Sequence, residues 1–111
     1  MLAPLDLIVL VTLSSWPDGT HGYQLLQAVR ADHDANVATT SLYRGIRGLL
    51  DRGLIAEVAP AAGEDPRRRR YQVTAAGLQA AKAEQQRLLR LFATSPRLAG
   101  ATSPRLAGAP S

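Results

Sequence analysis

One segment constrains the fold of this chain most, because its apolar residues share a face only if the segment is helical. It runs from Thr39 to Gly53 and reads TTSLYRGIRGLLDRG. Its apolar residues recur at i, i+4, i+7 and i+8, the spacing of one helix face, and they are Leu42, Ile46, Leu49 and Leu50. A threonine at the start suits an N-cap, and Gly53 suits the left-handed residue that follows a helix. The pattern predicts an amphipathic helix with defined ends.

The opposite face of this predicted helix is basic. Thr40, Arg44, Arg47 and Asp51 point away from the apolar stripe. A short helix with a basic outer face can enter the major groove of DNA, and an arginine can bind a guanine edge with two hydrogen bonds. We therefore expect the span from Thr39 and Thr40 to Arg47 to contact double-stranded DNA. An Arg47–Asp51 ion pair would compete only weakly, at about 0.3 to 0.5 kcal/mol.

Composition favours the same class of partner. The chain has 111 residues and a formal net charge of +4, and of its thirteen basic residues twelve are arginine. Arginine binds phosphate through two parallel hydrogen bonds. Cysteine is absent, which excludes disulfides and thiolate sites and fits a cytoplasmic protein. The apolar run Leu7 to Leu13 is far shorter than the roughly twenty residues that cross a bilayer, so we expect no membrane association.

Two helices are predicted before the basic one. The first begins near Pro4, continues through LDLIVLVTL, and should be deeply buried until SSWPDG ends it. The second follows Thr20, a candidate N-cap, and ends near Asp32. We interpret His21 as a local structural residue beside that cap, because no second ligand stands at metal spacing. An extended piece at 36–38 then leads into the basic helix, which predicts a helix-turn-helix.

A β-hairpin is predicted after Gly53. The run LIAEVA and the run RRRRYQVT favour strands, and PAAGEDP between them favours a loop. A hairpin after a helix-turn-helix is the wing of a winged-helix domain. We expect Arg67, Arg68, Arg69 and Arg70 to contact phosphates or the minor groove, with alternation placing Arg68 and Arg70 on one face. The alternative is a solvated charge run that protects an edge strand from aggregation.

A long final helix is predicted from Thr74, its candidate cap, to about residue 93. Apolar residues step by three and four along it, as in a dimerising heptad seam, and one glutamine interrupts them to fix the register. The expected dimer interface comprises Leu78, Ala81, Gln85, Leu88, Leu89 and Phe92. Packing against its own domain is the alternative. A repeated TSPRLAGA follows, so the predicted divisions are a DNA-binding domain over 1–74, a dimerisation helix over 75–93 and a flexible tail over 94–111.

Three motifs, taken together, resemble the PadR-like transcriptional regulators. HGYQLLQAV, SLYRGIRGLLDRGLI and the arginine run leading to YQVTAAG occur in the order and spacing of that family. The resemblance implies a mainly α fold with a small β-hairpin wing, and a dimeric winged-helix DNA binder that usually represses a nearby promoter. It places Ser41, Tyr43 and Arg44 at the start of the recognition helix and Arg68 and Arg69 in the wing.

The resemblance implies a structural role for Gly22 and Tyr23 of the HGY element. The sequence also departs from the family pattern. Ala38 stands where the family usually has a capping serine, so Thr39 or Thr40 must cap the recognition helix. Gly45 and Gly48 replace better helix formers, at roughly 1 kcal/mol each relative to alanine.

Two other functions stay open beside DNA binding. Some members of the family release DNA when a small aromatic ligand binds near the dimer interface, and here such a cavity would be lined by Leu10, Trp16 and Phe92. A winged helix can also bind protein instead of DNA, although four consecutive arginines argue against this. An enzyme is the least favoured class, because no paired carboxylates, catalytic triad or metal-spaced ligands occur. We expect no cofactor and no metal.

Overall fold

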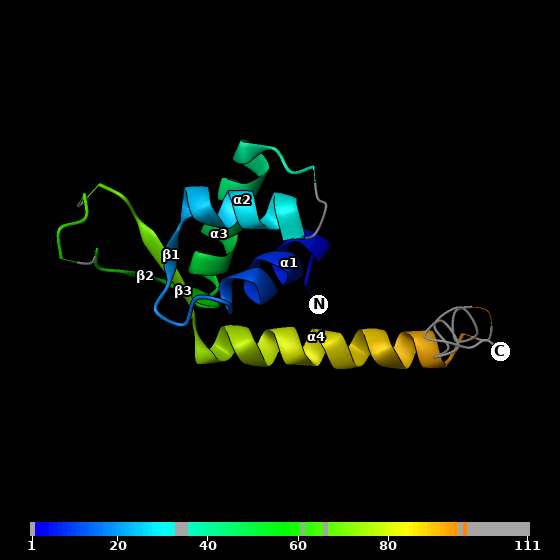
Figure 1. The fold of residues 1–111 in the computed structure, drawn as a ribbon. Coiled ribbons are helices and arrows are strands. Elements are labelled where there is room, and N and C mark those ends of the chain that lie inside the picture. The colour runs from blue at the N-terminus through cyan, green and yellow to red at the C-terminus, as the bar shows by residue number, and fades with distance from the viewer. Residues whose placement is uncertain (1, 33–35, 61, 66, 96, 98–111) are drawn as a thin grey trace. The chain divides into compact units, whose positions relative to one another are not determined.

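A computed structural model describes residues 2–32, 36–60, 62–65, 67–95 and 97 (Figure 1). The described chain contains four α-helices and a small antiparallel sheet, so the predicted fold class is confirmed. Internal contacts divide it into two units, residues 1–81 and 82–111, with the division inside the last helix. Most of the predicted tail, 94–111, lies outside the described residues.

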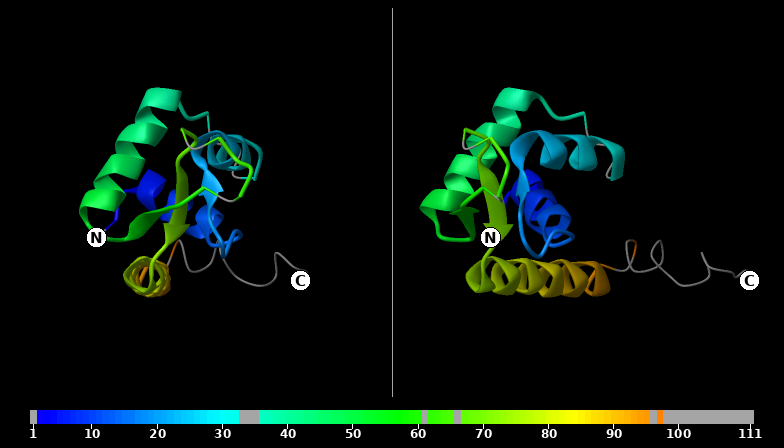
Figure 2. Two further views of the ribbon diagram at one scale, coloured as in Figure 1. Left: turned by 90° about the vertical axis from the view of Figure 1, so that its left-hand side faces the viewer. Right: turned by 60° about the vertical axis from the view of Figure 1, so that its left-hand side comes forward.

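Three helices form the core of the first unit. They are α1 (Pro4–Leu13), α2 (Gly22–Asp32) and α3 (Thr39–Asp51). Helix α1 contacts both of the others, as Figure 2 shows, and its almost continuous apolar run explains how it can do so. The fully buried side chains come from all three helices and from the segment that follows α3, and they include Val9, Leu10, Leu13, Leu25, Val29, Leu42, Ile46, Leu49 and Ile55.

Helix α3 ends as predicted but begins differently. Gly53 has φ +73°, and the N–H groups of Gly53 and Leu54 donate to the carbonyls of Leu50 and Leu49, which completes a Schellman motif. At the other end the N-cap is Ala38, which is extended and supplies no side-chain hydrogen bond. The expectation that a threonine caps this helix was therefore wrong. An alanine can stand there because the side chain of Arg30 holds the preceding backbone, with Nη2 2.6 Å from the carbonyl oxygen of Val37.

The sheet has one strand more than the predicted hairpin. Its strands are β1 (Thr20–His21), β2 (Ile55–Val58) and β3 (Arg70–Val73), in the order β1-β3-β2. The expected cap at Thr20 was also wrong, because Thr20 pairs with Tyr71 in the sheet. Instead, Nδ1 of His21 accepts the N–H of Gln24 at 3.3 Å in the first turn of α2. A two-residue strand carries no periodicity, so only the partner strand reveals it.

Helix α4 (Ala75–Ala93) begins at the predicted cap. The Thr74 hydroxyl accepts the N–H of Gly77 at 3.0 Å and donates to the carbonyl of Gly53 at 2.8 Å. One side chain therefore caps α4 and ties it to the residue that ends α3. Within the second unit, Arg87 donates to Glu84 one turn earlier. None of the described helices is long and apolar enough to cross a membrane.

Candidate nucleic-acid interface

The outer face of α3 carries every residue that we predicted to contact DNA from this helix. Leu42, Ile46 and Leu49 are buried beneath it. On the opposite side the polar residues are all exposed, namely Thr39, Thr40, Ser41, Tyr43, Arg44 and Arg47. Within the described part of the chain, Arg44 and Arg47 make no hydrogen bond or ion pair, and the competing Arg47–Asp51 pair does not form. Both guanidinium groups are therefore free to bind a partner.

The arginines of the wing differ from one another in their contacts. Arg67 pairs with Asp65 at 3.2 Å, and its side chain is 91% exposed. Arg69 pairs with Glu57 at 3.5 Å and is also exposed. The side chain of Arg68 is exposed and makes no hydrogen bond or ion pair among the described residues, while its backbone N–H donates to the carbonyl of Asp65 at 2.9 Å. Only Arg70 belongs to β3, so the expected alternation of four arginines along a strand was wrong: three of them belong to the loop.

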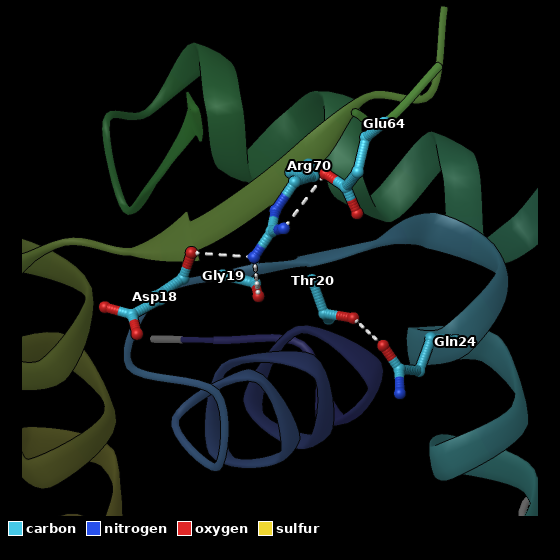
Figure 3. Close-up of polar contacts among 6 residues, drawn as sticks. All are labelled: Asp18, Gly19, Thr20, Gln24, Glu64 and Arg70. Atoms are coloured by element: carbon cyan, nitrogen blue, oxygen red, sulfur yellow. Dashed lines mark hydrogen bonds and ion pairs between the residues drawn. The ribbon is translucent and has the colours of Figure 1, made fainter. Parts of the chain in front are cut away.

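Arg70 is used inside the protein. Its guanidinium donates to Glu64 at 3.1 Å and to the carbonyls of Asp18 and Gly19 at 3.1 and 2.8 Å, as Figure 3 shows. The side chain is only 18% exposed. Arg70 thus joins the wing to the turn before β1, and its position favours a structural role over the DNA contact that we predicted for it.

An open groove of about 260 Å³ lies where the wing, α2 and α3 meet. Three tyrosines and three arginines surround it, together with the residues that start α2. Its lining consists of His21, Gly22, Tyr23, Tyr43, Arg67, Arg68, Arg69 and Tyr71. Sequence reasoning treated His21 and Tyr23 as structural and assigned nothing to Tyr71 beyond its strand, so it missed this site.

The missing side chain of Gly22 leaves room for the ring of Tyr43 on one side of the groove. The ring of Tyr43 lies so near that a β-carbon on Gly22 would be 2.5 Å from Oη and 2.7 Å from Cε1 of the tyrosine. The structural role that the resemblance implied for Gly22 thus has a steric reason. Tyr43 reaches from α3 to the HGY element, so its ring helps to set the distance between α3 and α2.

Burial and the arginines of the wing shift the pKa values of three nearby groups. Partial burial lowers the pKa of His21, and the nearby Arg68 lowers it further. The Arg67 backbone N–H, followed by its side chain, lowers the pKa of the exposed Asp65. Burial raises the pKa of Tyr71, with a contribution from Glu57. Burial therefore disfavours both a protonated His21 and an ionised Tyr71 in the groove, whereas the exposed Asp65 beside Arg67 favours its charged form.

Helix α4 presents apolar side chains to solvent. Leu78, Leu89 and Phe92 are exposed, Leu89 to 60%, and Gln85 is exposed between them. Ala81 and Leu88, which we also predicted for the dimer interface, are partly buried, and Ala81 packs against the core of the first unit.

The residues predicted to line a ligand cavity lie in different environments. Leu10 is 1% exposed and belongs to the hydrophobic core. Trp16 is half-buried in the turn after α1, and Phe92 belongs to the exposed stripe of α4. Leu10 therefore serves packing within the protomer. An aromatic effector site at these residues stays a prediction.

Comparison with known proteins identifies relatives of this arrangement. Residues 9–83 match the model of the "Transcriptional regulator PadR-like family". A PadR family transcription regulator from Clostridium difficile R20291 superposes with a TM-score of 0.69 at 17% identity, covering 80% of this chain and 91% of that one. A PadR family regulator from Eggerthella lenta gives a TM-score of 0.61 at 29% identity, covering 75% and 72%. A PadR-like regulator from Bacillus cereus gives 0.68 at 22%, covering 81% and 85%. No curated protein matches the chain at a significant level.

Proposed function

This chain belongs to the PadR-like family of transcriptional regulators, and from that premise we propose that it binds specific sites on double-stranded DNA as a homodimer. One observation carries the proposal. The exposed face of α3 holds two arginines that have no partner within the described protein, above a fully buried apolar face that fixes the orientation of the helix. A rigid helix that displays unpaired guanidinium groups is suited to the major groove.

Base discrimination is assigned to α3. Arg44 or Arg47 donates two hydrogen bonds to the O6 and N7 atoms of guanine, which is worth about 1 to 3 kcal/mol against a wrong base. The exposed hydroxyls of Thr39, Thr40 and Ser41 in the first turn of α3 contact the adjacent sugar-phosphate backbone of the DNA. These contacts set the register in which the arginines meet the bases.

Affinity is assigned to the wing. Arg68 neutralises a phosphate directly, because no carboxylate holds it in the described chain. Arg67 and Arg69 must exchange Asp65 and Glu57 for phosphate, and exposed ion pairs of this kind hold by only about 0 to 1 kcal/mol. Arg70 stays in its structural contacts. The wing therefore contributes about 0.9 to the salt slope of binding through Arg68 alone, rising to roughly 2.7 if Arg67 and Arg69 also exchange their carboxylates for phosphate, in place of the value for four arginines.

Gel-shift assays test whether α3 discriminates between DNA bases. Wild-type protein should select a discrete family of sites from random duplexes, and Arg44→Ala or Arg47→Ala should relax the preference at one guanine position per half-site. Arg90→Ala, an exposed arginine near the end of α4, is the matched control and should keep the wild-type preference. Equal, sequence-independent binding by all four proteins would refute specific readout.

The homodimer is proposed from the exposed stripe of α4. Three large apolar side chains, Leu78, Leu89 and Phe92, lie at helical spacing with Gln85 between them, and an exposed apolar stripe of this kind is a candidate interface. Two protomers also suit a palindromic site. Leu89→Asp with Phe92→Asp should give a monomer in sedimentation, whereas Arg90→Asp should stay dimeric. A dimer in the double variant would assign the interface to another surface.

Repression is the proposed outcome of binding, since a dimer seated on a promoter obstructs the polymerase. Such a role, together with the lack of cysteine, suits a protein of the cytoplasm. Transcription in vitro from the selected site should fall as the protein is added, and whichever of Arg44→Ala and Arg47→Ala loses the guanine preference should need a higher concentration for the same fall. A rise in transcription would instead identify an activator.

A further inference from the structure

We propose that the groove between the wing tip and the start of α2 is a phosphate-binding site, formed chiefly by Arg68, Tyr23 and Tyr43. A phosphate of the DNA backbone fills it in the complex, and the phosphate group of a small molecule can enter it in the free protein. The DNA half of this inference rests on the proposed function. The free-phosphate half does not, so the two can fail separately.

The lining of the groove has the donor chemistry that phosphate requires. The charged oxygens of a phosphate group are strong hydrogen-bond acceptors, and the polar side chains that surround this groove are arginines, tyrosines and one histidine, all of which can donate. No carboxylate lines it within the described residues. Asp65 and Glu57 engage Arg67 and Arg69 at the groove edge, whereas Arg68 is unpaired in that part of the chain. The site is therefore built for an anion.

The groove is continuous with the DNA-reading face. Tyr43, Arg69 and Tyr71 also line a second opening, of about 160 Å³, that runs beside Ile46, Arg47 and Leu50 of α3. A nucleic-acid strand that flanks the major groove would cross this surface from Arg47 toward Arg68. This continuity favours a backbone phosphate as one occupant of the groove, next to the bases that α3 reads.

His21 reports whether the site is filled. Its Nδ1 accepts the Gln24 N–H, so the neutral ring carries its proton on Nε2. The charged groups that act on His21 are Arg68 and Arg70, which lower its pKa, and Glu64, which raises it. A phosphate beside Arg68 would offset that positive charge, and the pKa of His21 should then rise.

The experiment follows the His21 ring by NMR across pH in the full-length protein. Three additions are compared at one ionic strength: sodium chloride, inorganic phosphate and a duplex that carries the selected site. Phosphate and duplex should each raise the pKa of His21 by about 1 relative to chloride. In Arg68→Gln the starting pKa should already be higher and should not respond. Arg90→Gln should behave as wild type.

Tyr23→Phe and Tyr43→Phe provide a second measurement. Each removes only a hydroxyl and keeps its ring, including the Cε1 edge of Tyr43 that lies beside Gly22, so folding should be unaffected while half-saturation by phosphate moves to higher concentration. Arg68→Gln should also lower the salt slope of DNA binding by about 0.9 per protomer. A response to duplex alone supports the site with DNA as its only source of phosphate, and a response to both supports the full proposal.

A His21 pKa that ignores both phosphate and duplex overturns the proposal, as does an undiminished response in Arg68→Gln. If the protein does not bind DNA but inorganic phosphate still raises the pKa through Arg68, the site stands and the proposed function fails. If DNA binds specifically without moving the pKa, the function stands and the site fails.

Discussion

The ring of Tyr43 occupies the space that a β-carbon of residue 22 would need, with Oη only 2.5 Å from that position. Helix α3 and the HGY element are thus fitted to each other through the ring of Tyr43 and the missing side chain of Gly22. The contact lies between α2 and α3, beside the groove that we assign to phosphate.

A double-mutant cycle should measure this fit. Gly22→Ala should lower the free energy of unfolding, because the methyl group forces the Tyr43 ring aside. The same change in a Tyr43→Ala background should be nearly neutral, which gives a coupling energy on the order of 1 kcal/mol in urea denaturation. Additive effects would show that the ring moves away without cost.

Gly48 within α3 and Gly53 just after its end should respond in opposite directions to replacement by alanine. A β-carbon on Gly48 would meet nothing within 4 Å, so Gly48→Ala should stabilise the helix by about 1 kcal/mol. Gly53 has φ +73°, so Gly53→Ala should destabilise by about 1 kcal/mol or more. Thermal unfolding measures both. If Gly48→Ala weakens DNA binding while it stabilises the fold, then the flexibility that Gly48 gives to α3 contributes to DNA binding.

Substitutions of Arg70 and Arg69 should differ in their effect on the free energy of unfolding. Arg70→Gln removes donors from Glu64 and from the carbonyls of Asp18 and Gly19, so we expect a loss of about 1.5 to 3 kcal/mol in unfolding free energy. Arg69→Gln removes an exposed pair and should cost less than about 1 kcal/mol. Equal losses in the two variants would contradict the structural assignment of Arg70.

Stability should fall as the pH drops below the ordinary pKa of histidine. The pKa of His21 is lowered in the folded protein, so between about pH 6.5 and that lower value the unfolded chain binds the additional proton. The contribution of the neutral ring is complete above about pH 6.5 and is lost toward acid. Protonation also removes the Nδ1 acceptor that caps α2.

His21→Asn tests this linkage, because asparagine keeps a cap acceptor but does not titrate. Its unfolding free energy in urea should vary less between pH 7.5 and 5.5 than that of wild type. His33→Asn changes the only other histidine and should leave the wild-type dependence intact. If His33→Asn is the variant that flattens the profile, His21 is not the group responsible.

The elements that sequence reasoning located are those whose pattern is complete within one segment. The stripe of α3, its glycine end and the Thr74 cap involve residues a few positions apart, so local periodicity and side-chain chemistry suffice. Strand β1 was not predicted from the sequence, because two residues are too few to show a periodicity and the strand is defined only by its pairing with β3. The N-cap at Ala38 was not predicted, because the support comes from Arg30 in another helix, which binds the preceding carbonyl of Val37.

The basic character of the interface was fixed by the sequence, since charge and helical spacing are properties of neighbouring residues. The role of each individual arginine was not determined by the sequence. Arg67, Arg68, Arg69 and Arg70 are chemically the same in a row of four, and they acquire different roles only when folding brings carboxylates and carbonyls to some of them. Asp18 and Gly19 lie far from Arg70 in the chain, as Gly22 does from Tyr43. Tertiary structure decided which guanidinium holds the fold and which is free for DNA, because a partner distant in sequence leaves no local pattern.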